Sequence, residues 1–346
     1  MMQVQENISL RKYNSFGIDA AARYFASFGS IAELEMLLDE KQYSGNPKLV
    51  LGGGSNILFT KDYDGIVLKN ELSGIQKVNE DAEHIYLRAA AGEVWHQFVQ
   101  YCISNNLGGV ENLSLIPGNV GASPMQNIGA YGVEIKDVFH SLEAYHISER
   151  QLVHFGLADC GFGYRESVFK RKYKDQFVIT AVTYRLKKHP VFNTSYGAIE
   201  QELVRMGVKE LSVKAIADAV INIRSSKLPN PAETGNAGSF FKNPEIAASH
   251  YSELKQAFPN IAGYDLPNGY VKLAAGWLIE HSGPENSSLS WKGYREGDAG
   301  CHAKQALVLV NYGNATGTEI FSLSEKIIRS VQKKYNVLLE REVNII

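Results

Sequence analysis

The chain has 346 residues, which is long for one domain and suits two or three. Hydrophobic residues make up 45% and charged residues 21%, as in an ordinary globular protein. The formal net charge is −2, so the sequence does not predict a nucleic-acid-binding surface. No apolar run reaches membrane-spanning length, and the first twelve residues lack the apolar core of a signal peptide.

The three cysteines, Cys102, Cys160 and Cys301, are odd in number and form no Cys-x-x-Cys pair. A disulfide framework or a zinc knuckle is therefore not expected, and a reducing, cytoplasmic environment fits. The nine histidines form no His-x-x-x-His pair on a plausible helix, so we expect no catalytic metal.

The pattern of predicted elements changes near residue 189. Before it, strands are predicted at 21–28, 48–51, 65–69, 84–91, 138–147, 151–155 and 177–187, helices at 31–40 and 93–106, and turns at 14–17 and 160–165. Ser30 is the expected N-cap of the first helix, and Gly108-Gly109 ends the second.

After residue 189 the chain reads as a second α+β region that is richer in loops. Residues 190–200 and 227–238 read as irregular, helices are predicted at 212–223, 272–281 and 318–335, and strands at 306–310 and 337–343. Ser212 would cap the first of these helices. Alternation along the last strand would place Glu340 and Glu342 on one face.

One stretch, residues 117–132, has Gly, Pro, Asn, Ser or Gln at most positions and few apolar anchors. Such a sequence is neither a helix nor a strand interior. Gly118, Gly121, Gly129 and Gly132 permit positive φ and a close approach of the backbone to a ligand. Successive N–H groups in such turns can form an anion-binding nest. Because long structureless loops are uncommon unless functional, we interpret the stretch as a ligand loop rather than as a plain surface loop.

A second glycine turn, residues 52–56, comes directly after the apolar run 49–51, which is a predicted buried strand. No Gly-Lys-Ser/Thr closes it, which excludes a P-loop. Ile57 stands where the Rossmann fingerprint needs its third glycine. The two turns together suggest two backbone loops that grip one large phosphate-bearing ligand.

This pair of loops resembles the FAD-binding domain of the vanillyl-alcohol-oxidase (PCMH) type. Over its whole length the chain is similar to the UDP-N-acetylenolpyruvoylglucosamine reductase family. The motifs that carry this similarity occur in the order Asn14-Ser15-Phe16-Gly17, Gly52 to Phe59, Ile116 to Gly132, Gly163-Tyr164-Arg165 and Gly235 to Pro244. A loop such as the one carrying Tyr196 marks the type I members, because type II members lack it.

The resemblance implies an α+β chain in which a two-lobed PCMH-type FAD-binding domain precedes a smaller α+β substrate-binding domain. The expected parts are the FAD-binding domain at 15–188 (lobes about 15–70 and 71–188), a connecting segment at 189–214, the substrate-binding domain at 215–325 and a terminal segment at 326–346. The connecting segment would carry Tyr196 on a lid loop, and the terminal segment would fold back toward the flavin.

The family reaction is the NADPH-dependent reduction of UDP-N-acetylglucosamine enolpyruvate to UDP-N-acetylmuramate through FAD, in peptidoglycan precursor synthesis. Hydride reaches the terminal vinyl carbon, and negative charge develops on the adjacent carbon and the carboxylate. A catalyst therefore needs positive charge near that carboxylate and an acid for the carbanion. The expected partners are the UDP-sugar and NADPH, and we expect a cytoplasmic monomer.

The resemblance assigns FAD binding to backbone and side chains of the two loops. The residues are Gly52, Gly53, Gly54, Ser55, Asn56, Pro117, Gly118, Gly121, Ala122, Ser123, Gln126, Asn127, Gly129, Ala130, Tyr131 and Gly132. Substrate binding is assigned to Tyr196, Lys227, Asn243 and Gln305. Lys227 would meet the diphosphate as a point charge, although each of the four alone would read as ordinary surface polarity.

Three residues match the catalytic positions of the family: Arg165, Ser239 and Glu342. The planar guanidinium of Arg165 suits a carboxylate, although the residue alone would read as a surface arginine. Ser239 stands in Gly-Ser-Phe-Phe rather than in a Gly-x-Ser-x-Gly elbow, and it matches the proton donor of the family. Glu342 would polarise the carboxyl region of the substrate together with Arg165.

The chain departs from the family pattern on both sides of Glu342. The pattern has Glu-Pro-Glu-Val where this chain has Arg341 in place of the proline. Many type I members have arginine two residues after the catalytic glutamate, where this chain has Asn344. Neither departure alters Glu342, while the second leaves the chain without the contribution of that arginine.

Two alternatives stay open. Another oxidoreductase of the same flavin superfamily, such as an alcohol oxidase, would often carry a histidine in the flavin loop, and residues 117–132 contain none. A non-catalytic nucleotide-sugar-binding protein of the same fold would be favoured by loss of Arg165, Ser239 or Glu342, and all three are present. Flavin that NADPH reduces in the purified protein would argue against a binding module.

Overall fold

The structure is a computed structural model that describes residues 4–43 and 45–346. The chain forms two compact units that interleave along the sequence. The described residues of unit 1 lie in Met1–Ile8, Ala22–Gly54 and Asp64–Ser226, and those of unit 2 lie in Ser9–Ala21, Ser55–Tyr63 and Lys227–Ile346. We expected consecutive domains, whereas unit 2 takes in two short segments from the first seventy residues. The roles expected of the domains stay predictions.

Unit 1 contains a four-stranded sheet in the order β1-β2-β5-β3, in which β3 and β5 are parallel. Its elements are β1 (Gln5–Ser9), β2 (Ala21–Phe28), α1 (Ile31–Asp39), β3 (Lys48–Leu51) and β5 (Tyr63–Asn70). The hydroxyl of Ser30 accepts a hydrogen bond from the N–H of Glu33 at 3.2 Å and so caps α1. The predicted strands, helix and cap of this region are confirmed.

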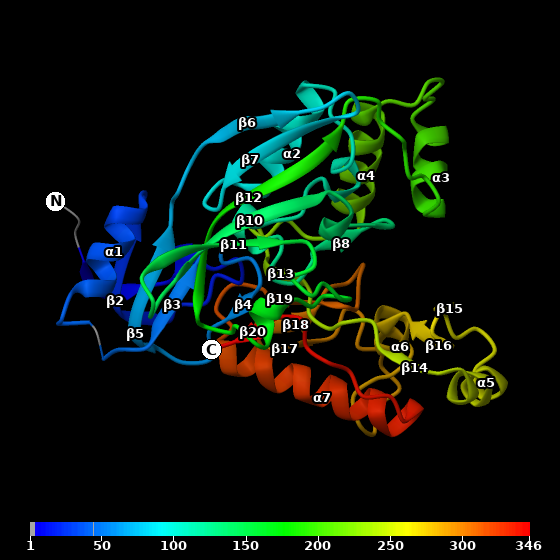
Figure 1. The fold of residues 1–346 in the computed structure, drawn as a ribbon. Coiled ribbons are helices and arrows are strands. Elements are labelled where there is room, and N and C mark those ends of the chain that lie inside the picture. The colour runs from blue at the N-terminus through cyan, green and yellow to red at the C-terminus, as the bar shows by residue number, and fades with distance from the viewer. Residues whose placement is uncertain (1–3, 44) are drawn as a thin grey trace. The chain divides into compact units, whose positions relative to one another are not determined.

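The larger sheet of unit 1 is antiparallel throughout, in the order β11-β10-β12-β7-β6 (Figure 1). Its strands are β6 (Ile75–Glu80), β7 (His84–Ala90), β10 (Phe139–His146), β11 (Gln151–Gly156) and β12 (Phe177–Lys187). Four of them were predicted. The strand β6 was missed, because its sequence is exposed at almost every position and lacks an apolar period.

Between the strands of its sheets, unit 1 contains one further helix and several short elements. They are α2 (Trp95–Ser104), the hairpin β8 (Gly129–Ala130) and β9 (Val133–Glu134), and the 3-10 turns η2 (Glu111–Leu113), η3 (Val120–Ala122), η4 (Ile135–Asp137) and η5 (Val168–Lys170). The helix α2 confirms the helix predicted at 93–106 with slightly shorter bounds.

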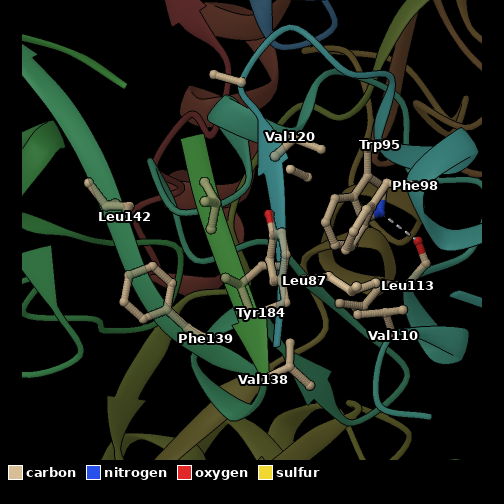
Figure 2. Close-up of a cluster of buried hydrophobic side chains, with 14 of the residues drawn as sticks. Leu87, Trp95, Phe98, Val110, Leu113, Val120, Val138, Phe139, Leu142 and Tyr184 are labelled. Carbon is tan, nitrogen blue, oxygen red and sulfur yellow. Dashed lines mark hydrogen bonds between the residues drawn. The ribbon is translucent and has the colours of Figure 1, made fainter. Parts of the chain in front are cut away.

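The main core of unit 1 is formed by side chains from α2 and from the five-stranded sheet (Figure 2). Trp95 and Phe98 of α2 lie against Tyr184 of β12, and the indole Nε1 of Trp95 donates to the carbonyl of Leu113 at 2.9 Å. The hydroxyl groups of Tyr184 and Ser123 are buried and lie 2.7 Å apart. Ser123 belongs to the predicted flavin loop, residues 117–132. Its contact with Tyr184 therefore fixes this loop to the core.

Two further helices of unit 1, α3 (Gly197–Arg205) and α4 (Val213–Lys227), share a small apolar core. The loop predicted at 190–200 is therefore too long, since α3 begins at Gly197 with Tyr196 as its N-cap residue. The hydroxyl of Ser212 accepts from the N–H of Ala215 at 3.1 Å, which confirms the predicted cap. The helix α4 lies in unit 1 up to Ser226, although we expected it in the substrate domain.

Unit 2 consists of short strands and three longer helices among its described residues. Its elements are η1 (Arg11–Tyr13), β4 (Ile57–Leu58), β13 (Gly235–Ser239), β14 (Glu245–Ala247), α5 (Ala248–Ala257), β15 (Gly263–Asp265), β16 (Tyr270–Leu273), α6 (Ala275–Glu280), β17 (Arg295–Glu296), β18 (Ala299–Cys301), β19 (Val308–Asn311), α7 (Gly317–Tyr335) and β20 (Asn344–Ile345). Its sheets have the orders β13-β19-β18-β17, β14-β16-β15 and β20-β4.

The helix α7 packs against β18, β19 and α6 (Figure 1). It begins with a capping box, in which Thr316 and Glu319 bond to each other's backbone N–H groups. Its apolar residues recur on one face, and this face is buried, as the predicted helix at 318–335 requires.

Two predicted elements of unit 2 were wrong, and the irregular stretch predicted at 227–238 is too long, because β13 begins at Gly235. The helix predicted at 272–281 is strand β16 followed by the shorter helix α6, because residues 270–273 pair with both neighbouring strands. The strand predicted at 337–343 makes only an isolated bridge, between Arg341 and Phe241, and regular pairing resumes at β20, which is parallel to β4. None of the described helices has the length and apolar content needed to cross a membrane.

Removing the hydroxyl of Tyr184 should destabilise unit 1 even though the ring remains. Burial raises the pKa of this phenol, so it stays protonated and pairs with Ser123. Tyr184→Phe leaves the buried Ser123 hydroxyl without this partner, and we expect a loss of about 1–3 kcal/mol in the free energy of unfolding. Urea unfolding followed by circular dichroism measures the loss. Tyr184→Phe/Ser123→Ala should recover part of it, and an unchanged midpoint for the single variant would contradict the account.

Candidate active site

The two glycine turns of the sequence lie against each other in unit 1. A Cβ placed on Gly53 would come within 2.7 Å of Oδ1 of Asn119 and 2.9 Å of Cα of Gly118. Asn119 is in turn fixed by its Nδ2, which donates to the carbonyl of Gly92 at 2.5 Å. A glycine is therefore required at position 53 for the turns to meet, and the structure brings together the two loops predicted to hold one ligand.

The backbone at this meeting point has unused donors. Within the described part of the chain, the N–H groups of Gly53, Gly54, Gly118 and Asn119 donate to no acceptor. Gly54 and Gly118 adopt positive φ, at 63° and 111°. Neighbouring N–H groups in turns of this kind bind anions, so the arrangement suits a phosphate-bearing ligand.

Other residues of the flavin loop serve the packing of the chain itself. A Cβ on Gly121 would lie 2.6 Å from Cβ of Ala91, and the N–H of Gly121 donates to the carbonyl of Ala91 at 2.9 Å. The side chain of Ser123 is turned into the core, where it meets Tyr184. The glycine at 121 and the hydroxyl at 123 are thus explained without a ligand, and their contact with FAD stays a prediction.

Left-handed backbone is concentrated in this region. Leu115, Asn127 and Tyr131 have φ values of 58°, 44° and 50°, and Arg165 has a φ of 52°. Residues other than glycine adopt this conformation at a cost, and such residues cluster at functional sites. The surrounding contacts must therefore hold this backbone in place.

Asn127 supplies several of these contacts. Its side chain is fully buried, and its Nδ2 donates to Oε2 of Glu134 at 3.1 Å and to the carbonyl of Gly163 at 3.0 Å. Its Oδ1 accepts from the N–H of Lys136 at 3.0 Å. A buried amide that is satisfied on both sides fixes the three segments that it joins. One of them, at Gly163, leads directly to Arg165.

Arg165 occupies a tight two-residue turn between Gly163 and Glu166, whose backbones exchange hydrogen bonds at 3.0 and 3.3 Å. Its Nη2 donates to the carbonyl of Gly129, inside the flavin loop, at 2.5 Å. The hydroxyl of Ser167 adds a bond to the carbonyl of Met125 at 2.6 Å. The structure therefore places the predicted catalytic arginine against the predicted flavin loop, through side-chain bonds to backbone carbonyls that the motif alone did not reveal.

Tyr196 also lies against the flavin loop. Its ring meets the ring of Tyr131 edge to face, with centroids 5.3 Å apart, and it is 49% exposed. Burial raises the pKa of Tyr131. The buried Asn112 donates from its Nδ2 to the carbonyls of Tyr131 and Asn193, each at 2.9 Å. Asn112 was missed in the sequence, where nothing distinguishes it from its polar neighbours Glu111 and Ser114.

In unit 2, Ser239 and Glu342 belong to neighbouring backbone segments. Ser239 pairs with Val308 of β19, and the following carbonyl, of Phe240, accepts from the N–H of Glu342 at 2.9 Å. The N–H of Lys242 donates to the carbonyl of Glu340, also at 2.9 Å. These bonds place the predicted proton donor and the predicted catalytic glutamate on one short antiparallel strip.

An ion pair reinforces this strip. Nζ of Lys242 lies 2.6 Å from Oε1 of Glu340, and the lysine side chain is only 9% exposed. Glu340 therefore serves as a structural partner for Lys242, whereas Glu342 is not needed for that pair. The sequence distinguished the two glutamates only through the family pattern.

Asn56, which also belongs to unit 2, is bonded to the C-terminal part of this strip. Its Nδ2 donates to the carbonyl of Glu342 at 3.2 Å, and its carbonyl accepts from the N–H and Nδ2 of Asn344 at 3.1 and 2.9 Å. Asn56 is a predicted FAD-binding residue, so part of its bonding capacity is already used by the C-terminal segment.

Two predicted substrate residues meet at the start of α6. Oδ1 of Asn243 accepts from the N–H of Ala275 at 3.0 Å, and a Cβ on Gly276 would lie 2.8 Å from Oε1 of Gln305. Lys227 is exposed at the end of α4. The structure brings Asn243 and Gln305 together within unit 2, and the contact of each residue with a substrate stays a prediction.

Comparison with known proteins shows what two parts of the chain are similar to. Residues 22–152 match the model of an FAD binding domain, and residues 230–346 match the C-terminal domain of UDP-N-acetylenolpyruvoylglucosamine reductase. A solved structure of UDP-N-acetylenolpyruvylglucosamine reductase from Thermus caldophilus has the same fold, with a TM-score of 0.66 and 22% identity over 100% of this chain and 99% of that one.

Similar sequences extend over the full length. The chain is 52% identical to the UDP-N-acetylenolpyruvoylglucosamine reductase of Amoebophilus asiaticus and 48% identical to that of Flavobacterium johnsoniae, with 100% of each chain covered. It is 47% identical to the Pseudomonas putida enzyme over 99% of both chains. At this identity and coverage, the chain belongs to the UDP-N-acetylenolpyruvoylglucosamine reductase family.

Proposed function

We propose that this protein reduces UDP-N-acetylglucosamine enolpyruvate to UDP-N-acetylmuramate, with NADPH as hydride donor and FAD as bound cofactor, in peptidoglycan precursor synthesis. The observation that carries the proposal is the full-length family match. It is supported by Arg165, Ser239 and Glu342, which stand in motifs that resemble those of the family's catalytic residues. These residues favour an enzyme over a binding module of the same fold.

The glycine turns of unit 1 fit FAD. Four backbone N–H groups without acceptors in the described chain lie where the turns meet, and they would bind the diphosphate of the cofactor. Residues 117–132 contain no histidine for a covalent link, which supports a non-covalent flavin. When bound, FAD accepts hydride from NADPH and supplies it to the enolpyruvyl group.

Arg165 would bind the carboxylate of the enolpyruvyl group. Its guanidinium stays charged and presents several donors in one plane, and its Nη2 donates to the carbonyl of Gly129. Charge that develops beside the carboxylate during reduction would be stabilised by this fixed cation. The tight turn would fix the backbone of Arg165, and the bond to Gly129 would restrict its guanidinium.

Ser239 would donate the proton that completes the reduction at the carbon next to the carboxylate. Its side chain is exposed, its backbone pairs with Val308, and the N–H of the next residue, Phe240, donates to the carbonyl of Leu307. A donor with a fixed backbone has a defined position, which general acid catalysis requires. Glu342, on the adjacent segment, would orient the carboxyl region of the substrate.

Tyr196, Lys227, Asn243 and Gln305 would bind the UDP-sugar. Tyr196 is half exposed at the start of α3, where a tyrosine can close over a nucleotide. Lys227 would attract the diphosphate, and the amides of Asn243 and Gln305 would bond to polar groups of the sugar or nucleotide.

We extend the proposal to a monomeric, cytoplasmic enzyme. Its three cysteines are unpaired and buried, and burial raises the pKa of the Cys160 and Cys301 thiols to about 12. Such thiols are inert and form no disulfides, which agrees with a reducing compartment.

The direct test of the function is the oxidation of NADPH by the purified holoenzyme. UDP-N-acetylglucosamine enolpyruvate should support steady consumption of NADPH, while UDP-N-acetylglucosamine, which lacks the enolpyruvyl group, should not. Equal consumption with both sugars, or with neither, would refute the assignment.

Gly53→Ala should weaken FAD binding. The added methyl group would press on Gly118 and Asn119 where the two turns meet, at a cost of roughly 1–3 kcal/mol. We expect the Kd for FAD to rise about tenfold or more, measured by flavin fluorescence during reconstitution of the apoprotein. Gly156→Ala is the matched control, because its Cβ would find ordinary space at 3.4 Å. Equal affinity of both variants would contradict the role of the turn.

Ser239→Ala should slow the reoxidation of the flavin by the UDP-sugar without slowing its reduction by NADPH. Reduction of the flavin by NADPH needs no proton on a substrate carbon, so its rate should stay near that of the parent. Reoxidation by the UDP-sugar should slow by roughly 10²–10⁴, the usual effect of losing a positioned acid. Stopped-flow absorbance of the flavin measures both rates, and Ser239→Cys should restore part of the second. Equal slowing of both half-reactions would show that Ser239 supports the fold rather than donating a proton.

A further inference from the structure

The residue before Glu342 is anchored to the helix α7. Nε of Arg341 donates to Oγ of Ser324 at 2.8 Å, and its Nη2 forms an ion pair with Glu325. Its guanidinium carbon lies 4.5 Å from the centre of the Phe321 ring. One side chain thus makes three different contacts with a single turn of α7.

The hydrogen bond to Ser324 is sheltered from solvent, whereas the side chain of Glu325 is 38% exposed. Ser324 is fully buried, and its own hydroxyl donates to the carbonyl of Phe321 at 2.6 Å, so its oxygen is oriented to accept from Arg341. The side chain of Arg341 is 20% exposed. Hydrogen bonds of a partly buried guanidinium are stronger than those at the surface and restrict the backbone that carries it.

The backbone of Arg341 itself forms no hydrogen bond with the neighbouring segment at Phe241. The bonds from Lys242 to Glu340 and from Glu342 to Phe240 flank the pair Arg341 and Phe241, so the N–H of Arg341 takes no part in the pairing. A proline, which the family pattern has here, would therefore cost no hydrogen bond and would fix φ through its ring. In this chain the residue has its N–H, and its side chain bonds to α7 instead.

The other side of Glu342 is held by Asn344. Both the N–H and the Nδ2 of Asn344 donate to the carbonyl of Asn56, and the Nδ2 of Asn56 donates back to the carbonyl of Glu342. Glu342 is therefore fixed from both flanks by the two residues at which this chain departs from the pattern.

We propose that Arg341 is a positioning residue for Glu342, replacing the conformational restriction of a proline by its contacts with α7. The inference rests on the proposed role of Glu342 in reducing the UDP-sugar. A misplacement of about 1 Å at a reacting centre can cost a factor of about 10², so loss of the anchor should be visible in the rate.

The test compares Arg341→Met, Arg341→Pro and Arg329→Met by stopped-flow absorbance. Arg341→Met removes the anchor but keeps an unbranched apolar side chain, and we expect it to slow flavin reoxidation by the UDP-sugar about 10- to 100-fold. Flavin reduction by NADPH should stay within about twofold, since it does not use Glu342. Arg341→Pro should recover most of the lost rate. Arg329→Met removes an exposed arginine from the same helix and should change neither rate.

A double variant separates positioning from a general effect on stability. If Arg341 acts through Glu342, Arg341→Met should slow Glu342→Gln no further, whereas independent effects would multiply. Multiplying effects, equal slowing of both half-reactions, or a proline variant as slow as Arg341→Met would overturn the proposal. A normal reoxidation rate for Glu342→Gln would instead refute the role of Glu342 itself, and so would be distinguished from failure of the anchor.

Discussion

The site in unit 1 depends on one buried amide. The flavin loop has almost no helix or strand of its own, so its backbone must be held by side chains from elsewhere. Asn127 does this while it adopts a left-handed conformation, and its two amide atoms bond to Glu134, Lys136 and Gly163. Through Gly163 it also sets the turn of Arg165. The backbone of the flavin loop and the turn that carries Arg165 thus depend on the same contact.

Helices and strands with a strong apolar period were predictable from the sequence. Elements that form only because a neighbouring strand pairs with them were not. The caps at Ser30 and Ser212 and the long helix α7 follow from local side-chain chemistry, and the structure confirms them. Exposed β6 carries no apolar period, and β16 is a strand only because β14 and β15 pair with it. The residues around Arg341 alternate in burial as a strand would, but they lack a continuous neighbour.

The same distinction applies to the site. The glycine pattern predicted two ligand loops, and the contact of Gly53 with Gly118 supports the pairing. Residue type alone could not show that Ser123 faces Tyr184 in the core. Nor could it show that Asn112 joins the flavin loop to the segment before Tyr196. A motif identifies which groups are present, while the packing decides which of them remain available to a ligand.

The measurement that tests the central claim most directly is a single turnover without oxygen. Holoenzyme reduced by one equivalent of NADPH is mixed with one equivalent of UDP-N-acetylglucosamine enolpyruvate, and the flavin spectrum and the mass of the sugar are followed together. The account predicts complete return of the oxidised flavin spectrum and conversion of the enolpyruvyl ether to a lactyl ether, heavier by two hydrogen atoms. Flavin that stays reduced until air is admitted, with the sugar unchanged, would contradict it.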